Sequence, residues 1–140
     1  MPTRVLLDSN VFLFAFELRT SNSHRILEML STGEIRGVVT DRIVREVLGY
    51  LRRHYGKDVS GKFRDFVLLT CDLVLEEDAR IRPDHVAQVG AKDAGALAAV
   101  RALGISRVVS TDSDFAEIPE RRTPRDFLRE LGKRPRPGDE

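Results

Sequence analysis

Residues 3–10, TRVLLDSN, carry a short apolar run into a carboxylate, and residues 106–115, SRVVSTDSDF, repeat that arrangement near the other end of the chain. A short continuous apolar run is typical of a strand that is buried on both faces of a parallel sheet. Residues 38–39 (VV) and 73–75 (LVL) have the same character. The four runs therefore predict the strands of a mainly parallel sheet, with acidic residues after the first and the last.

The segments between these runs carry apolar residues at helical spacing. In residues 40–55, Ile43, Val47 and Leu51 form one stripe, and Gly56 follows as a stop signal. The helices predicted in this way cover residues 11–18, 21–30, 40–55, 63–69, 94–103 and 124–131. Strands that alternate with helices predict an α/β fold, a single domain with a mainly parallel central sheet flanked by helices.

Two segments depart from this alternation. Residues 76–92 are expected to form a loop, because Pro83 would break any helix begun before it. Residues 132–140, GKRPRPGDE, are rich in proline, glycine and charge, which predicts a disordered tail. We therefore place the folded domain at residues 1–131.

The composition limits the class of protein. The chain has 140 residues, of which 41% are hydrophobic, as in an ordinary globular domain. Its longest apolar run, VFLFAF, is far shorter than the roughly 20 residues that cross a bilayer, and the N-terminus does not follow the pattern of a secretory signal. We therefore predict a cytoplasmic protein with no membrane partner. One cysteine and three separated histidines form no thiolate or imidazole cluster, so any metal would be bound by oxygen.

Acidic residues follow two of the predicted strands. Asp8 comes after the first strand, and Asp112 and Asp114 come after the last one. In a parallel sheet the carboxyl ends of the strands meet at one edge, where ligands bind. Carboxylates that converge there repel one another unless a cation lies between them, and Mg²⁺ and Mn²⁺ prefer oxygen ligands. The alternative is that Asp8 and Asp112 cap the turns after their strands.

Two further acids lie on predicted helices. Asp93 heads a buried stripe that continues through Leu97 and Val100, so its carboxylate needs a partner, although it could instead be the N-cap of that helix. Glu46 borders an apolar stripe beside Ile43 and faces a cleft, with a solvated surface position as the alternative. Since each acid has a plain structural explanation, the case for a shared site depends on their combination.

That combination resembles the PIN-domain nucleases, and in particular small stand-alone members such as the VapC-type toxins. The resemblance is carried by DSN from Asp8, VREVLGYL around Glu46, KDAGALAAVRALG around Asp93 and STDSDF around Asp112. The segment TPRDFL also resembles the closing helix of the family, so the likeness extends from residue 3 to about residue 131. Each motif is weak by itself, whereas four in the family's order are fairly specific.

The resemblance implies metal-dependent cleavage of RNA by an endoribonuclease. One or two Mg²⁺ or Mn²⁺ ions would activate a water molecule for in-line attack on a phosphodiester. The catalytic residues that it implies are Asp8, Glu46, Asp93 and Asp112. The implied metal ligands are Asp8, Asp93, Asp112 and Asp114, with Asn10 and Ser110 as hydrogen-bonding supports of these acids. In this arrangement Glu46 would orient or deprotonate the attacking water.

The resemblance also implies partners, namely an RNA substrate, an antitoxin protein and a second copy of the chain in a homodimer. Arginines on the helix that carries Glu46 either contact an RNA backbone or form a solvated surface. These arginines are Arg42, Arg45, Arg52 and Arg53. A toxin of a toxin–antitoxin pair is the first hypothesis. An RNA-processing or quality-control nuclease and a non-catalytic scaffold stay open as alternatives.

Overall fold

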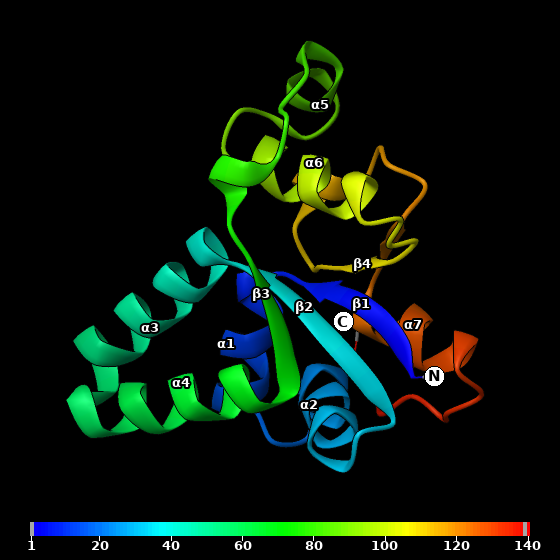
Figure 1. Cartoon of the computed structure of the whole chain (residues 1–140). Helices are drawn as coiled ribbons and strands as arrows, with labels where there is room; N and C mark the ends of the chain where they lie inside the picture. The colour runs from blue at the N-terminus through cyan, green and yellow to red at the C-terminus, as the bar shows by residue number, and fades with distance from the viewer. Residues whose placement is uncertain (1, 139) are drawn as a thin grey trace.

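The computed structural model describes residues 2–138 and 140, and within these residues it contains one five-stranded sheet (Figure 1). Its strands are β1 (Thr3–Leu7), β2 (Ile35–Thr40), β3 (Cys71–Val74), β4 (Val108–Val109) and β5 (Arg121–Arg122). Their order across the sheet is β3-β2-β1-β4-β5, and all neighbouring strands run parallel. The predicted α/β class with a parallel central sheet is confirmed.

Helices cover both faces of this sheet. They are α1 (Ser9–Glu17), α2 (Asn22–Thr32), α3 (Asp41–Tyr55), α4 (Lys57–Thr70), α5 (Pro83–Val89), α6 (Ala94–Ala102) and α7 (Pro124–Glu130), with short 3₁₀ turns η1 (Glu76–Asp78) and η2 (Ser113–Phe115). Figure 1 shows α1 to α4 on one side of the sheet and α5 and α6 on the other. None of these helices is long and apolar enough to cross a membrane.

The two helical layers follow from the order of the strands. The chain moves outward from β1 through β2 to β3, then crosses back over the sheet to β4 on the far side of β1. Right-handed crossovers that run in opposite directions place their helices on opposite faces. The carboxyl ends of β1 and β4 therefore border the point where the chain reverses, and ligands of open α/β sheets bind in the crevice at such a point.

The carboxyl-terminal part of the central strand β1 lies in the core of the protein. Its residues Val5, Leu6 and Leu7 are fully buried, and the same core includes Phe12 from α1 and Phe127 from α7. Truncating side chains in such a core typically costs about 2–5 kcal/mol of unfolding free energy. The residue that follows β1 is therefore held on a rigid support.

Helix α3 forms for reasons that are visible in its sequence. The side chain of its N-cap, Thr40, accepts a hydrogen bond from the backbone N–H of Ile43 at 3.2 Å. The predicted stripe of Ile43, Val47 and Leu51 is buried. The helix ends at Gly56, whose φ of +94° suits glycine. The prediction for residues 40–55 is confirmed to within one residue.

One prediction along the chain is wrong, and one strand was not predicted. Pro83 does not leave residues 76–92 as a loop, because it occupies the first turn of α5, where its missing N–H costs nothing. The edge strand β5, Arg121–Arg122, was not predicted, since two arginines carry none of the apolar character that marks a buried strand. Two residues suffice here because β5 needs to pair only with the equally short β4.

The C-terminal residues 132–138 and 140 return to the start of α2. The backbone N–H of Arg136 donates to Asn22 Oδ1 at 2.6 Å. The carboxylate of Glu140 accepts from the backbone N–H groups of Asn22 at 2.6 Å and Ser23 at 2.9 Å. An anion at a helix N-terminus is favourable because those N–H groups have no partner within the helix. The disorder predicted for this tail stays a prediction, and its resistance to proteolysis would test it.

Candidate active site

Acidic residues gather at the carboxyl ends of β1 and β4. Asp8 follows β1 directly, and its backbone N–H donates to the carbonyl oxygen of Val109 in β4 at 3.1 Å. Asp112 and Asp114 follow β4, Asp112 just before η2 and Asp114 within it. The structure thus brings the first and the last acidic motifs of the sequence to the same edge of the sheet.

The carboxylate of Asp8 is buried, with 4% of the residue exposed. Its Oδ1 accepts from the backbone N–H of Ser9 at 2.8 Å, and its Oδ2 accepts from the hydroxyl of Ser110 at 2.7 Å. Burial raises the pKa of Asp8, and these two hydrogen bonds oppose that effect. Asp8 is also the N-cap of α1, so its capping role is compatible with a position in the acidic cluster.

Asn10 and Ser110 connect the loop after β1 to the loop after β4. Asn10 Oδ1 accepts from the backbone N–H of Thr111 at 3.3 Å. The hydroxyl of Ser110, which donates to Asp8, also accepts from the backbone N–H of Asp112 at 2.9 Å. Ser110 thus contacts both Asp8 and the backbone of Asp112, and Asn10 joins the start of α1 to the backbone of Thr111.

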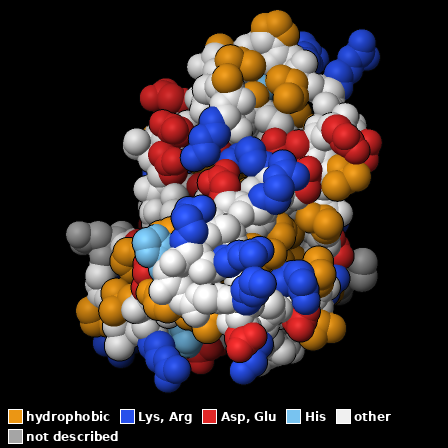
Figure 2. Space-filling view, turned by 90° about the vertical axis from the view of Figure 1, so that its left-hand side faces the viewer, with side chains coloured by type: hydrophobic (Ala, Val, Ile, Leu, Met, Phe, Trp, Pro, Cys, Tyr) orange, Lys and Arg blue, Asp and Glu red, His pale blue; other side chains and the backbone are white. Residues whose placement is uncertain are grey.

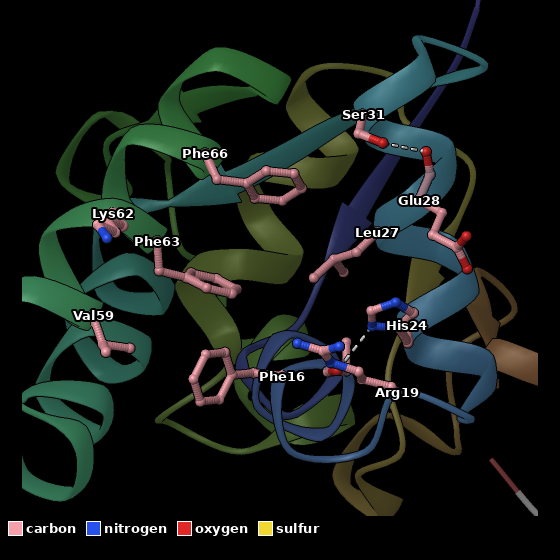
Figure 3. A pocket seen from close by; sticks show the side chains of 11 residues that line it. Phe16, Arg19, His24, Leu27, Glu28, Ser31, Val59, Lys62, Phe63 and Phe66 are labelled. Carbon is pink, nitrogen blue, oxygen red and sulfur yellow. Dashed lines mark hydrogen bonds between the residues drawn. The ribbon is translucent and has the colours of Figure 1, made fainter.

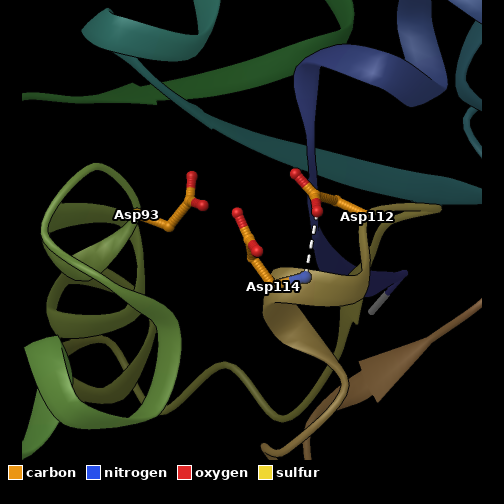
Figure 4. A group of neighbouring side chains, drawn as sticks. All are labelled: Asp93, Asp112 and Asp114. Atoms are coloured by element: carbon orange, nitrogen blue, oxygen red, sulfur yellow. Dashed lines mark hydrogen bonds between the residues drawn. The ribbon is translucent and has the colours of Figure 1, made fainter.

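Three of the aspartates converge on one small region (Figure 4). Asp93, Asp112 and Asp114 each offer a carboxylate oxygen, and these oxygens all lie within 4.8 Å of one another. Asp112 Oδ1 also accepts from the backbone N–H of Asp114 at 2.9 Å, which sets the turn of η2. Asp8 is not part of this group at that distance, although its charge acts on Asp93.

Asp93 is the most strained member of the cluster in electrostatic terms. It is 2% exposed, and within the described part of the chain its buried Oδ2 has no hydrogen-bond partner. Although Asp93 is the N-cap of α6, its side chain makes no capping hydrogen bond there, so capping does not explain it. Burial, followed by the charge of Asp8, raises the pKa of Asp93 to about 6.

Arg42 lies among the acids rather than on the surface. Its Nε donates to Glu76 Oε2 at 3.2 Å, its Nη2 donates to Asp93 Oδ1 at 3.2 Å, and its Nη1 pairs with Glu46. The side chain is 18% exposed. The sequence interpretation offered Arg42 as an RNA contact or a solvated residue, whereas the structure joins it to three carboxylates.

Glu46 joins the acidic cluster through its ion pair with Arg42. Besides the ion pair with Arg42, its Oε2 accepts from the hydroxyl of Ser9 at 3.3 Å. The ammonium of Lys92 lies 3.7 Å from the same oxygen, on a side chain that is 63% exposed. Such an exposed pair is worth little in stability. Glu46 is therefore held mainly by Arg42 and Ser9.

Glu76 belongs to the cluster and was not predicted. Its Oε2 accepts from the hydroxyl of Thr40 at 2.6 Å as well as from Arg42, and its backbone N–H donates to Asp41 Oδ1 at 2.9 Å. A methyl group on Gly95 would collide with the Glu76 carboxylate. Glu76 comes soon after β3, so the rule that placed Asp8 at the sheet edge could have found it.

The donor set suits a hard divalent cation. All the groups that converge are carboxylates, and Mg²⁺ and Mn²⁺ prefer oxygen ligands. The buried Asp93 Oδ2 is a charged atom that lacks a partner among the described residues, which is costly unless a cation or a proton meets it. Asp93, Asp112 and Asp114 are therefore the residues best placed to hold a metal.

Basic side chains lie near the acids on the side formed by α3 and α4, where Lys and Arg gather beside Asp and Glu (Figure 2). Arg45 pairs with Asp41 at 3.0 Å and is 71% exposed. Arg52, with Lys57 and Arg64, lines a separate hollow of about 350 Å³ between α3 and α4. These arginines stay candidates for contacts to an RNA backbone.

An apolar groove lies apart from the acidic cluster, between α1, α2 and α4 (Figure 3). It has a volume of about 540 Å³. Phe16, Phe63 and Phe66 line it, and the ring centroid of Phe63 lies 6.0 Å from that of Phe16 and 5.8 Å from that of Phe66. Arg19 and Lys62 also line this groove. It shares no residue with the acidic cluster.

The fold and the acidic edge define the class of protein. The chain belongs to the PIN-domain family, whose model matches residues 4–114. This range contains every acid of the cluster described above, from Asp8 to Asp114. Among curated proteins, none matches the sequence significantly.

Solved structures with the same fold include relatives from bacteria and an archaeon. A toxin–antitoxin complex from Klebsiella pneumoniae has 19% identity and a TM-score of 0.62, covering 86% of this chain and 97% of that chain. VapC20 of Mycobacterium tuberculosis, described as a toxin that cleaves the sarcin–ricin loop, has 14% identity and a TM-score of 0.55, covering 82% and 97%. PAE2754 of Pyrobaculum aerophilum has 18% identity and a TM-score of 0.53, covering 94% and 98%. At these identities the likeness shows a shared fold.

Proposed function

We propose that this protein is a metal-dependent endoribonuclease that hydrolyses RNA phosphodiester bonds and serves as the toxin of a toxin–antitoxin pair. One observation carries the proposal. The buried carboxylate of Asp93, with an oxygen that lacks a partner among the described residues, lies within 4.8 Å of oxygens of Asp112 and Asp114 at the edge where α/β folds bind ligands. Membership of the PIN-domain family supports the nuclease class.

In this proposal Asp93, Asp112 and Asp114 hold Mg²⁺ or Mn²⁺, and the negative charge of Asp8, which already acts on Asp93, adds to the attraction for the cation. The bound ion supplies a Lewis acid for the phosphodiester and lowers the pKa of its water. Ser110 keeps Asp8 oriented through its 2.7 Å hydrogen bond. We assign to Glu46, which Arg42 and Ser9 hold in place, the orientation of the attacking water.

The toxin role is supported by what is known of the structural neighbours. One forms a toxin–antitoxin complex, and another is a toxin that cleaves the sarcin–ricin loop. Exposed apolar surface often marks a protein–protein interface, and we assign the antitoxin contact to the groove lined by Phe16, Phe63 and Phe66. Arg19 and Lys62 in this groove favour a partner segment that is acidic as well as apolar. Such a toxin would act on RNA in the cytoplasm. The homodimer stays a prediction that sedimentation analysis would test.

RNA cleavage by the purified protein tests the nuclease proposal. We expect a mixture of structured RNAs to be cut in the presence of Mn²⁺ or Mg²⁺ and left intact with EDTA. The Asp8→Asn variant should lose at least about a hundredfold in rate, a loss of roughly 3 kcal/mol of transition-state stabilisation.

The control is Asp65→Asn, an exposed carboxylate of α4 that pairs only with its neighbour Arg64 in the described structure. It should cleave at the wild-type rate. Equal cleavage by wild type and Asp8→Asn would identify a contaminating nuclease. Absence of cleavage by the metal-loaded wild type across this mixture would favour the non-catalytic scaffold.

A further inference from the structure

The guanidinium of Arg42 occupies the interior of the acidic cluster. It contacts carboxylates from three separate elements, namely Glu46 on α3, Glu76 in η1 and Asp93 at the start of α6. A planar guanidinium has five N–H donors, and here its three nitrogens each meet a different acid. Arg42 is therefore the main positive charge inside the cluster among the described residues.

This position is built into the fold. The carboxylate of Glu76 accepts a hydrogen bond from Arg42 Nε. The same carboxylate accepts a second hydrogen bond, at 2.6 Å, from the hydroxyl of Thr40, which holds it in position. The start of α6 passes close to the Glu76 carboxylate at Gly95, where a Cβ atom would collide with that carboxylate in its present position. The N-cap of α3, the turn after β3 and the first turn of α6 thus combine to hold the guanidinium against Asp93.

The two carboxylate oxygens of Asp93 differ in their hydrogen-bond partners. Oδ1 accepts a hydrogen bond from Arg42, whereas Oδ2 is the buried oxygen without a partner in the described chain. A divalent cation on this carboxylate would stand within a few ångströms of the guanidinium, and the repulsion between a double and a single positive charge at that distance is many times the thermal energy in a poorly solvated site. Full occupancy of Asp93 by both cations is therefore unfavourable.

We propose that Arg42 is the counter-cation of the metal-free acidic centre and competes with the divalent cation for Asp93. This inference rests on the metal site of the proposed function. Without metal, Arg42 holds Glu46, Glu76 and Asp93 together and keeps the centre assembled. When metal binds, the guanidinium withdraws from Asp93 and stays with Glu46 and Glu76. The cost is a weaker affinity for the divalent cation than the aspartates alone would provide.

Calorimetric titration of Mn²⁺ into the metal-free protein, without RNA and at constant ionic strength, tests this competition. Arg42→Gln should bind Mn²⁺ about tenfold or more tightly than wild type, equivalent to about 1.4 kcal/mol. The matched control is Arg45→Gln, which removes the same charge from the same helix at an exposed position. Because solvent screens the charge of Arg45, the affinity of Arg45→Gln for Mn²⁺ should differ from that of wild type by less than about threefold.

A second variant separates the local contact from net charge and guards against misfolding. Arg42→Gln with Glu76→Gln has the net charge of wild type and leaves no charged Glu76 without its partner. It should still bind Mn²⁺ more tightly than wild type and show a larger metal-induced rise in melting temperature. Affinity that falls in both variants would mean that Arg42 positions the ligands instead, and would overturn the competition. Failure of wild type itself to bind Mn²⁺ would defeat the proposed metal site.

Discussion

The acidic cluster has two halves that differ in how their negative charge is compensated. In the arginine half, formed by Arg42, Glu46 and Glu76, both carboxylates have a guanidinium as partner. In the aspartate half, formed by Asp8, Asp93, Asp112 and Asp114, the acids face one another. Each carboxylate of the first half therefore has a positive partner within the chain, whereas among the described residues of the second half only Asp93 has one, through Arg42.

Asp93 is the residue that the two halves share. One of its oxygens belongs to the arginine half through Arg42, and the other has no partner in the described chain. The ion pair does not cancel the effect of burial and of Asp8, since the pKa of Asp93 is still raised to about 6. The comparison teaches that negative charge without a positive partner is concentrated in the aspartate half, which is where we propose that a cation binds.

The largest expected effect concerns the unbalanced charge of Asp93. Its pKa rises from 3.8 to about 6 on folding, so the folded state binds more protons than the unfolded state between these values. Metal-free stability should therefore fall as pH rises from about 4 to about 6, by up to roughly 3 kcal/mol from this group. Urea unfolding of wild type and Asp93→Asn across this range measures the effect, because the variant should lack this contribution.

The quantity to compare is the difference in unfolding free energy between wild type and Asp93→Asn at each pH. Other carboxylates with lowered pKa values, such as Glu120 and Glu130, reduce the stability of both proteins on acidification, and that effect cancels in the difference. As pH rises, the stability of Asp93→Asn should increase relative to that of wild type. Added Mn²⁺ should cancel this relative increase, because it should stabilise only wild type. Parallel stability curves for the two proteins would show that Asp93 carries no uncompensated charge.

A second, smaller effect is expected at the hydrogen bonds that hold the aspartate half. Ser110→Ala removes the donor to Asp8 Oδ2 and the acceptor of the Asp112 N–H. Because both atoms are then left without this partner, we expect a loss of about 1.5–3 kcal/mol in the free energy of unfolding. Ser113→Ala, at an exposed position in the same loop, is the control and should stay within about 0.5 kcal/mol of wild type. A loss for Ser110→Ala no larger than the control would remove Ser110 from the support of the site.

The smallest effect concerns the arginine half. Gly95→Ala places a methyl group against the Glu76 carboxylate and should displace it from Arg42. We expect a net loss of about 1 kcal/mol, because overpacking costs about 1–3 kcal/mol and alanine regains up to about 1 kcal/mol of helix propensity. Gly61→Ala in α4 meets nothing within 4 Å and should stabilise the protein by about 0.5–1 kcal/mol. Melting curves of both variants would give shifts of opposite sign, and shifts of the same sign would argue against a close fit around Glu76.

Much of the fold could be predicted because its signals are local. The apolar runs at Thr3–Leu7 and Val108–Val109 are strands at the predicted positions, and the alternation of strands with helices indicated the parallel sheet. Pro83 was misread because proline breaks a helix interior and begins a helix equally well. The edge strand Arg121–Arg122 could not be found from its residues, since only pairing with β4 makes it a strand.

The sequence by itself determined which acids follow strand ends and head buried stripes, because those positions depend on neighbours a few residues away along the chain. Asp8, Asp93 and Asp112 were identified in that way. Only the tertiary structure decided which acids have a partner. The contact between Arg42 and Asp93 joins residues 51 positions apart, and it depends on how α6 packs over Glu76. The electrostatic energy of a carboxylate is set by its burial and by charges within a few ångströms, and neither quantity exists until the chain has folded.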